Sequence, residues 1–483
     1  MRRAFAVLWV TLCAYASLAF AQSSEKSDVP QRLVRLGVAA SDAKGEPVLD
    51  LRAADVQVRE DGQPRRVVFF RFNGTYRTIS PPGPGEFINR PAPAPTIILL
   101  DRWNERLMTM ASAWHDVSVA LAHMESLDRV YVYFLTAHGE LFPVDPLPLP
   151  DADLRVPAPT TAAELVAKVN DAVRAFEGFR DIDARDPVLR AKTTGDALTM
   201  LSRGASMAGR KNLIWVTHGF PLSARLVTGE LGDFTLPVQN LAQTVARFQM
   251  AIYAVGQSAK GAGADPAGLG RQTLEMVSAL TGGRLYASGR IDEAIARAIA
   301  DARGSYWLAY DSPVRENGRK EHQIRLDSVR KGVRLLTRKA YFGDEPDPDP
   351  DQSAEAAFSS QGHCPFDATE IALRVAMSRK LAATAFHFDI HVDPADVLIH
   401  RRGERFEGGL NVMLALYSNG VFQGGSFPIQ KDLNLNQEEF DSASKDGILI
   451  TQDVNVNNQI QQVRVMVFDR TLHRMGSVTI PIR

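Results

Sequence analysis

Asp101 is the residue best placed in this sequence to do chemistry. It directly follows four branched apolar residues at positions 97–100, in the run Pro-Thr-Ile-Ile-Leu-Leu-Asp. A run without polar alternation indicates a strand buried on both faces, as in a parallel sheet covered by helices. Ligands of open α/β sheets bind at the carboxyl ends of such strands. We therefore expect Asp101 to belong to a binding site or to the remains of one.

A second group of polar residues alternates with apolar ones between residues 386 and 393. His387, Asp389, His391 and Asp393 occupy every second position, so they share one face of the predicted strand. Imidazoles and carboxylates in this arrangement could bind a metal ion. A solvated face opposite a buried one has the same spacing, and we favour that interpretation.

A catalytic nucleophile with its base is not evident in the sequence. Ser202, Ser206 and Ser305 lack the Gly-x-Ser-x-Gly context of a nucleophile elbow. Cys364 follows His363, but adjacent residues of an extended chain point to opposite sides. We therefore expect no enzymatic activity.

The elements around Asp101 alternate between strand and helix. The strand pattern covers residues 97–100, 130–135, 212–216, 250–255 and 285–287, and helical patterns lie between these runs. This alternation predicts a doubly wound α/β sheet with right-handed crossovers. Three further strand-like runs, 306–310, 322–326 and 333–339, close this part of the chain.

Shorter alternating runs flank this region on both sides. Before it we expect a small β unit and a Pro/Gly linker, and after it an acidic, proline-containing linker with a short helix at 368–377. The last hundred residues or so, with a hairpin signal at Asn419-Gly420, predict an Ig-like β-sandwich. The predicted boundaries are 1–21 signal peptide, 32–77 β unit, 78–95 linker, 96–342 α/β domain, 343–382 linker and 383–483 sandwich.

Composition and the first residues indicate an exported globular protein. The 483-residue chain is 45% hydrophobic and 23% charged, with a net charge of -1, which argues against nucleic-acid binding. Arg2 and Arg3 precede an apolar stretch and the cleavage-type sequence Ala19-Phe20-Ala21, as in a signal peptide. We expect no membrane span after cleavage, since no other segment reaches the roughly 18 apolar residues that a span needs. Cys364 would then be the only cysteine left, which excludes an internal disulfide.

Several stretches resemble the von Willebrand factor type A (VWFA)-related proteins of the acidobacterial type. Their order and spacing along the chain carry the resemblance more than any one of them does. The matching stretches are residues 55–62, 96–101, 209–221, 251–255, 281–283, 305–310 and 336–342. The resemblance implies a VWA-like (Rossmann-like) central domain.

The resemblance also implies a metal-ion-dependent adhesion site (MIDAS) at the top of the sheet, where a divalent ion is held by Asp-x-Ser-x-Ser, a threonine and a Thr-Asp-Gly aspartate. Asp101 matches the first aspartate, but Trp103 and Glu105 stand at the two serine positions. Lys192 stands at the threonine position, and Thr217-His218-Gly219 replaces Thr-Asp-Gly. A lysine ammonium offers only donors and could pair with Asp101 in place of a metal. We therefore expect a largely degenerate site without a high-affinity metal or other cofactor.

An alternative is a rearranged divalent-metal site. Asp101, Glu105 and His218 would be its ligands, because two carboxylates and an imidazole suit a transition metal.

The function that we expect is protein–protein interaction of the adhesion or scaffold type, at the cell envelope or outside the cell. The predicted location is periplasmic, outer-surface or secreted, and the partner is an unidentified protein. The contact face would comprise Asp101, Trp103, Glu105, Lys192, Thr194 and His218, with Trp103 as an aromatic anchor or a core residue. The alternatives are an envelope hydrolase with its site at the same sheet edge and a purely structural envelope protein.

Overall fold

The computed structural model describes most of the chain after the predicted signal peptide. The described residues are 32–73, 82–89, 94–104, 107–124, 127, 129–147, 160–175, 186–204, 209–256, 269–286, 290–313, 319–343, 350–380 and 384–482. The predicted signal peptide and Glu105 lie outside these ranges, as do residues 78–81 and 90–93 of the predicted Pro/Gly linker.

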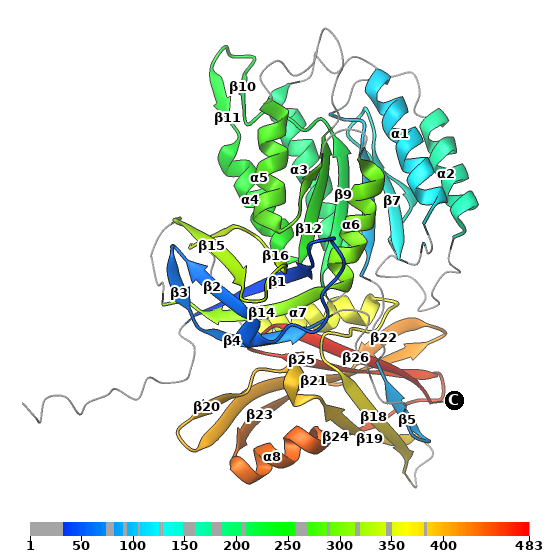
Figure 1. Cartoon of the computed structure of the whole chain (residues 1–483). Coiled ribbons are helices and arrows are strands. Elements are labelled where there is room, and N and C mark those ends of the chain that lie inside the picture. Colours follow the sequence, from blue (N-terminus) through cyan, green and yellow to red (C-terminus); the bar gives the residue numbers. More distant parts are fainter. Residues whose placement is uncertain are drawn as a thin grey trace, which may run out of the picture.

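A six-stranded sheet forms the centre of the upper part of the molecule (Figure 1). Its strand order is β13-β12-β9-β6-β7-β8, and all neighbours are parallel except β7 and β8. All six residues of β6 are buried, as the uninterrupted apolar run predicts. The strands of this mixed sheet are β6 (Thr96–Asp101), β7 (Val130–Leu135), β8 (Leu141–Asp145), β9 (Lys211–Thr217), β12 (Met250–Gly256) and β13 (Leu285–Tyr286).

Helices cover both faces of the mixed sheet. Ile97 and Leu99 of β6 pack on the side of α3 (Pro187–Gly204), α4 (Thr235–Arg247) and α5 (Leu269–Thr281). Ile98 and Leu100 pack on the side of α1 (Leu107–Ala122), α2 (Ala162–Ala175) and α6 (Ile291–Arg303). Successive residues of a strand point to opposite faces, so one apolar run supplies both cores. Asp101, the last residue of β6, thus lies at the carboxyl edge of the mixed sheet, where α3 and α4 begin.

A short hairpin projects from this edge, at the top of Figure 1. It consists of β10 (Ser223–Arg225) and β11 (Leu231–Asp233) and lies between β9 and α4 in the chain. Its turn is closed by a hydrogen bond from the Gly229 N–H to the Leu226 carbonyl, at 2.9 Å, with Gly229 at a φ of 88°. The side chain of Leu226 packs so closely against Gly232 that an added Cβ there would lie 2.7 Å from it. The hairpin is therefore a defined projection from the sheet edge.

The N-terminal strands pair with strands that follow α6. One antiparallel sheet has the order β16-β1-β14-β4, and a second has the order β17-β15-β2-β3. Both sheets thus combine residues 33–72 with residues 305–342. The elements are β1 (Leu33–Ser41), η1 (Ala53–Asp55), β2 (Val56–Glu60), β3 (Gln63–Arg65), β4 (Val67–Phe72), β14 (Ser305–Asp311), β15 (Glu321–Ser328), β16 (Arg334–Leu336) and β17 (Ala340–Phe342).

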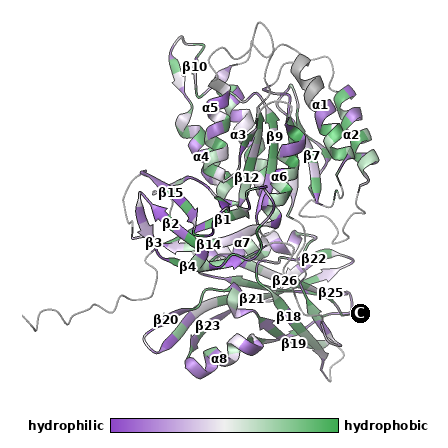
Figure 2. Cartoon of the chain, in the orientation of Figure 1, coloured by the Kyte–Doolittle hydropathy of each residue, from purple (hydrophilic) through white to green (hydrophobic). Residues whose placement is uncertain are grey.

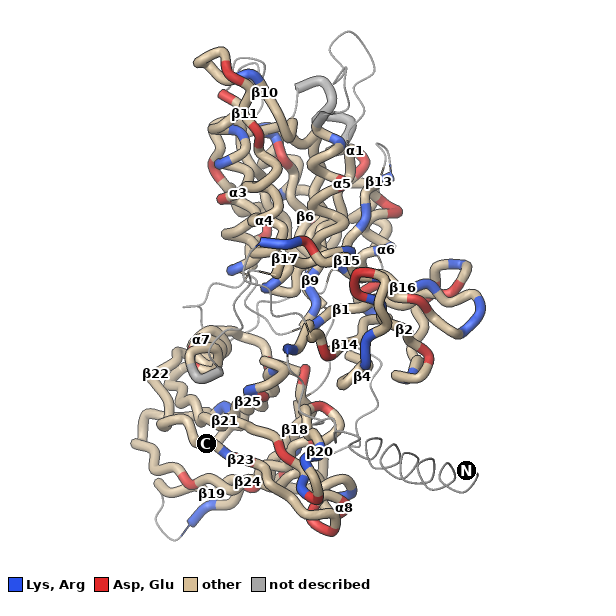
Figure 3. The backbone as a smooth tube through the Cα atoms, turned by 90° about the vertical axis from the view of Figure 1, so that its left-hand side faces the viewer, with Lys and Arg blue, Asp and Glu red and all other residues tan. Residues whose placement is uncertain are grey.

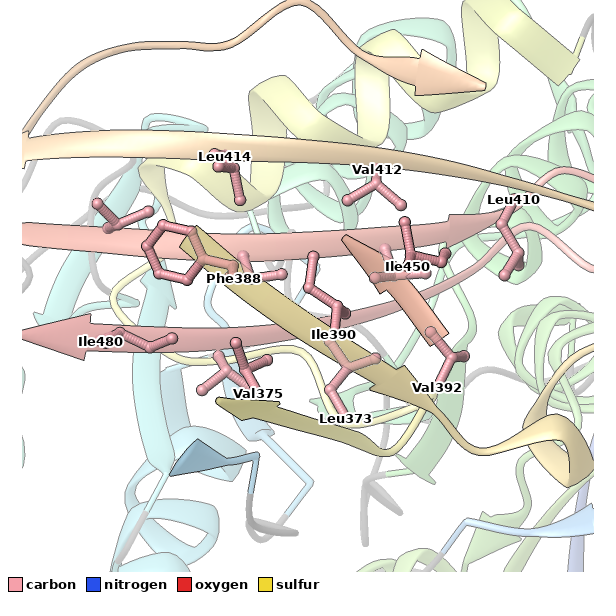
Figure 4. Packing of buried hydrophobic residues seen from close by; sticks show 14 of the residues in the cluster. Leu373, Val375, Phe388, Ile390, Val392, Leu410, Val412, Leu414, Ile450 and Ile480 are labelled. Atoms are coloured by element: carbon pink, nitrogen blue, oxygen red, sulfur yellow. The ribbon is translucent and has the colours of Figure 1, made fainter. Parts of the chain in front are cut away.

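Two antiparallel sheets pack face to face in the lower part of Figure 1. Figure 4 shows the interleaved apolar side chains between them, including Phe388, Ile390, Val412 and Ile480. The first sheet contains β5 (Glu86–Ile88), β18 (Leu373–Arg379), β19 (Ala385–Val392) and β24 (Ile448–Asn455). The second contains β20 (His400–Arg402), β21 (Arg405–Ser418), β22 (Val421–Gly425), β23 (Ile429–Leu435), β25 (Gln462–Asp469) and β26 (Arg474–Pro481). The remaining elements are α7 (Pro350–His363), η3 (Pro394–Asp396) and α8 (Gln437–Asp446).

The distribution of hydrophobic residues matches the arrangement of the sheets. Figure 2 shows hydrophobic residues concentrated in the strands of the mixed sheet and of the two lower sheets, whereas α8 and the outer strands β2 and β15 are mainly hydrophilic. Each region therefore has a core of its own.

The predicted fold class is wrong for this chain. We expected a doubly wound α/β domain of VWA type with separate β units on either side. Antiparallel strands instead dominate the described residues, where five of the six sheets contain only antiparallel pairs and the mixed sheet ends in the antiparallel strand β8. The N-terminal strands also share sheets with β14–β17, so they do not form a flanking unit of their own. Pairing between strands far apart in sequence leaves no local signal, which is why the pattern did not reveal it.

The short helix predicted at 368–377 is also wrong. Residues Leu373–Arg379 form β18, which pairs with β5 and β19, and the helix of this region is α7 (Pro350–His363). The alternating burial at the start of β18 fits a strand that covers a core on one face.

Candidate functional site

Asp101 lies inside the protein at the carboxyl edge of the mixed sheet. Its side chain is fully buried and accepts hydrogen bonds on both oxygens. The backbone N–H of Asn104 donates to Oδ1 at 3.0 Å, and the Asn104 amide donates to Oδ2 at 2.7 Å. From strand β9, the indole N–H of Trp215 and the hydroxyl of Thr217 donate to Oδ2 at 3.0 and 2.8 Å. Four donors of the protein itself therefore hold this carboxylate.

Burial and hydrogen bonding shift the pKa of the Asp101 carboxyl in opposite directions. Burial raises the pKa of the Asp101 carboxyl above its usual range, because water no longer solvates the charge. The hydrogen bonds from Asn104, Thr217 and Trp215 oppose that shift, since they favour the ionised form. The buried carboxylate is thus stabilised by neutral dipoles.

The amide of Asn104 lies between Asp101 and Thr194. Its Nδ2 donates to Asp101 Oδ2 and also to Thr194 Oγ1, at 2.8 Å, and that hydroxyl donates to the Arg190 carbonyl at 2.8 Å. Arg190 Nε in turn donates to Asn104 Oδ1 at 3.3 Å, which orients the amide. Mg²⁺ needs oxygen ligands, so an amide N–H₂ group at this point does not fit a divalent ion.

The structure brings together three of the site residues that we predicted from the sequence: Asp101, Trp103 and Thr194. Trp103 is 5% exposed, belongs to the core on the α3 side and donates its indole N–H to the Arg190 carbonyl at 3.3 Å. Thr194 is fully buried. We call the group around Asp101 the buried cluster; its members are Asp101, Trp103, Asn104, Arg190, Thr194, Trp215 and Thr217. A macromolecular partner would therefore contact the residues that surround the buried cluster before it contacted the cluster itself.

Lys192 and His218 are placed differently. Lys192 Nζ lies 2.5 Å from Asp196 Oδ2, one turn along α3, and both side chains are mostly exposed. The alternative in which Lys192 pairs with Asp101 is therefore wrong. His218 is half-buried in the loop after β9, where the backbone of Gly219 approaches Gly270 so closely that a Cβ on Gly219 would lie 2.7 Å from the Gly270 carbonyl. Glu105 lies outside the described residues.

Sequence reasoning missed four members of this cluster: Asn104, Arg190, Trp215 and Thr217. Trp215 carried a signal, because an indole N–H inside a fully buried strand needs an acceptor. Asn104 carried a weaker one, since Asp side chains often accept from the backbone N–H a few residues later. Within the described ranges, no group of three or more His, Cys, Asp or Glu side chains could hold a metal ion.

The alternating polar residues of β19 lie on its partly exposed face, opposite a buried one. His387 bonds to Asp453 Oδ1 at 2.6 Å and to Asp389 Oδ1 at 3.1 Å. His391 instead contacts the Asp446 carbonyl. The hydrogen bond to Asp453 raises the pKa of His387 above its usual range, with a further contribution from Asp389.

This pKa shift predicts a small pH dependence of stability. Because the folded state holds the His387 proton more tightly than the unfolded state does, the contribution is fully present below the ordinary pKa of about 6.5 and is lost as pH rises through the folded value. We expect the urea midpoint to fall less between about pH 6 and pH 8 in His387→Gln than in the unmodified chain. Parallel pH profiles of the two proteins would contradict this assignment.

Exposed aliphatic side chains gather at the same sheet edge. Val227 and Leu231 of the hairpin are 87% and 76% exposed, and Leu236 at the start of α4 is 50% exposed. Val188 and Leu189 in the first turn of α3 are also exposed. The hairpin leads directly into α4, and α3 packs beside α4. We call these five residues the hairpin surface.

Comparisons with known proteins leave the family open. No family model matches the chain, and no curated protein matches it. The resemblance to the VWFA-related proteins therefore stays a prediction. No helix in the described part of the chain is long and apolar enough to cross a bilayer.

Among solved structures the chain has weak similarity to two proteins. One is the pilus adhesin SpaC from Lactobacillus rhamnosus GG in its open conformation, at 10% identity and a TM-score of 0.28, covering 89% of this chain and 56% of the adhesin. The other is the human COPII-coat protein Sec24c, at 11% identity and a TM-score of 0.25, covering 53% of this chain and 44% of that protein. The chain thus spans about half the length of these structures.

Proposed function

We propose that this chain is an exported, non-catalytic protein-binding protein of the adhesion or scaffold type. Its contact area is the hairpin surface, and its partner is another protein. The proposal rests on one observation: large aliphatic side chains are exposed on a well-defined projection at the sheet edge.

The clustering of these aliphatic side chains distinguishes the hairpin surface from an ordinary exposed surface. A single exposed leucine or valine is normal in a soluble protein. Several such residues from neighbouring elements, with polar residues around them, are typical of a surface that a partner covers. Arg225, Glu230 and Asp233 supply polar neighbours on the hairpin itself. Their charges could orient a partner, while Val227 and Leu231 would provide the apolar contact.

The buried cluster supports the hairpin surface without taking part in binding. Arg190 donates to the Gly219 carbonyl at 3.2 Å, which joins the start of α3 to the loop after β9. Ala191 and Leu222 pack against the same core, directly beside the exposed residues of α3 and β10. The hydrogen bonds around Asp101 thus fix the base from which the hairpin projects.

Site-specific photocrosslinking tests this proposal. A photoreactive phenylalanine analogue would replace Val227 in the full chain, expressed in the organism that produces it. The matched control carries the analogue at Val329, which is 55% exposed near the turn after β15. We expect a discrete crosslinked protein from position 227 and none from position 329.

A second substitution separates specific contact from proximity. Leu231→Glu places a charge in the apolar contact, and the expected loss of crosslink is about tenfold or more. Since Leu231 is exposed, the folding free energy should change by less than about 0.5 kcal/mol. Equal crosslinking from both positions, none from position 227, or a product that survives Leu231→Glu would refute the proposal; the second outcome would favour a purely structural role.

A further inference from the structure

A cavity of about 370 Å³ lies where three parts of the chain meet. Its walls come from β1, from the end of α4, from the β14 and β16–β17 region, and from the turn between β25 and β26. Figure 1 places these elements at the waist between the upper and lower parts of the molecule, and Figure 3 shows Lys/Arg segments beside β1 and β9 there. The cavity is separate from the cluster around Asp101.

The charge lining this cavity has one sign. Five of its lining residues are arginines, and no Asp or Glu occurs among the described residues that line it. The arginines are Arg32, Arg35, Arg210, Arg247 and Arg338. Guanidinium groups favour phosphate and sulfate, because their paired N–H groups match two oxygens of such an anion.

Two of these arginines have buried nitrogens without a partner. Arg210 is 7% exposed, and its hydrogen bonds go to the Gly282 carbonyl and the Tyr253 hydroxyl, at 2.9 and 3.1 Å. Arg338 donates to the Arg35 carbonyl at 3.3 Å. The Nε atoms of both Arg210 and Arg338 are buried and make no hydrogen bond. A buried donor left without an acceptor costs free energy, which an anion in the cavity would recover.

His473 lines the cavity as a neutral side chain. Burial first, and then the nearby Arg35, lower the pKa of His473 to about 4, so its imidazole is neutral near neutral pH. In the turn between β25 and β26, the backbone of His473 is in the left-handed conformation. Its backbone N–H donates to the Asp469 carbonyl at 2.8 Å. A neutral imidazole can still donate one hydrogen bond to an anion.

Part of the remaining wall is apolar. Trp307, Tyr341 and Leu472 line the cavity beside the arginines. The carboxylate of Glu370 lies behind this wall, where it accepts from Trp307 and Gln249 at 2.9 and 3.2 Å and from the backbone N–H of Met475 at 3.1 Å. Its oxygens are therefore engaged by Trp307 and Gln249 of the lining and by one backbone N–H.

We propose that this arginine cavity binds the phosphate or sulfate group of a small ester, whose organic part packs on Trp307 and Tyr341. The volume is in the usual range for small-ligand sites, roughly 300–1,000 Å³. Because the walls come from β1, α4 and the β25–β26 turn, a bound anion would also tie these parts of the chain together.

Calorimetry on the full mature chain tests this site, with inorganic phosphate, inorganic sulfate and phenyl phosphate as probes at matched ionic strength. We expect a Kd below about 1 mM for phosphate or sulfate. Phenyl phosphate should bind about tenfold more tightly than phosphate, because its ring covers the apolar wall. Comparing the Kd of inorganic phosphate with that of inorganic sulfate identifies whether the site prefers a phosphate or a sulfate ester.

Two variants and one control locate the binding. Arg247→Gln changes an exposed residue at the end of α4, and Arg338→Gln changes a half-buried one. Each should weaken phenyl phosphate binding by about tenfold, through loss of a charge-assisted hydrogen bond. Arg325→Gln, which removes an exposed arginine paired with Asp327, should leave it unchanged. No binding of any probe, binding unaffected by Arg247→Gln, or equal loss in Arg325→Gln would overturn the proposal.

Discussion

Replacing Asp101 with alanine is expected to destabilise the chain by about 3–5 kcal/mol, because several buried donors then lose their acceptor at once. The groups concerned are the indole N–H of Trp215, the hydroxyl of Thr217 and both N–H donors of Asn104. Urea unfolding followed by tryptophan fluorescence measures the change, and Trp215 itself is a nearby probe.

Asp196→Ala is the matched control, since Asp196 is a 60% exposed carboxylate paired with Lys192 on helix α3. Its expected effect is below about 0.5 kcal/mol, as for most surface ion pairs. If Asp101→Ala unfolded at nearly the same urea concentration as Asp196→Ala, Asp101 would not be the structural anchor described above.

The second large effect is expected at Glu60, the last residue of β2. Its side chain is fully buried and accepts from Arg65 Nε at 2.8 Å and from the Tyr341 hydroxyl at 2.6 Å. The hydroxyls of Tyr310 and Ser312 donate to it as well, at 3.0 and 2.9 Å. One carboxylate thus joins β2 and β3 to the ends of β14 and β17. Removing one partner of a buried ion pair leaves the other uncompensated, so Glu60→Ala should cost about 3–5 kcal/mol in urea unfolding.

Asp50→Ala provides the comparison for Glu60. Asp50 pairs with Arg330 at 2.7 Å, also across distant parts of the chain, but its side chain is 75% exposed. We expect a loss below about 1 kcal/mol there. Comparable losses at the two positions would show that the N-terminal strands do not depend on the buried carboxylate for their attachment.

Local patterns predicted the elements of this protein better than their arrangement. The run before Asp101 is a fully buried strand, and Val238, Leu241 and Val245 form the buried stripe of α4 at helical spacing. Such signals arise within a few residues. The partner strands β14 of β1 and β15 of β2 lie about 270 residues further on, and no local pattern encodes which distant strand completes a sheet. This is why the fold class was mistaken while many strand positions were right.

The same limit applied to the candidate site. The spacing after β6 drew attention to Asp101, but its chemistry depends on Asn104, Trp215 and Thr217. Burial and donor direction decide whether a carboxylate binds a ligand or anchors a fold, and neither can be read from spacing alone. Lys192 illustrates the point, because its helical neighbour Asp196 is a closer partner than the buried carboxylate. The arginine cavity had no sequence signal, since its arginines come from residues 32 to 338.

Asp101 is a buried anchor and the hairpin surface binds the partner, and one measurement tests directly whether these two roles are separate. The crosslinking yield from position 227 would be measured in EDTA and again in millimolar Mg²⁺. Because the donors around Asp101 do not fit a divalent ion and the contact is apolar, the same yield is expected in both conditions. A product that forms in Mg²⁺ and disappears in EDTA would show that a metal governs binding and would contradict the account.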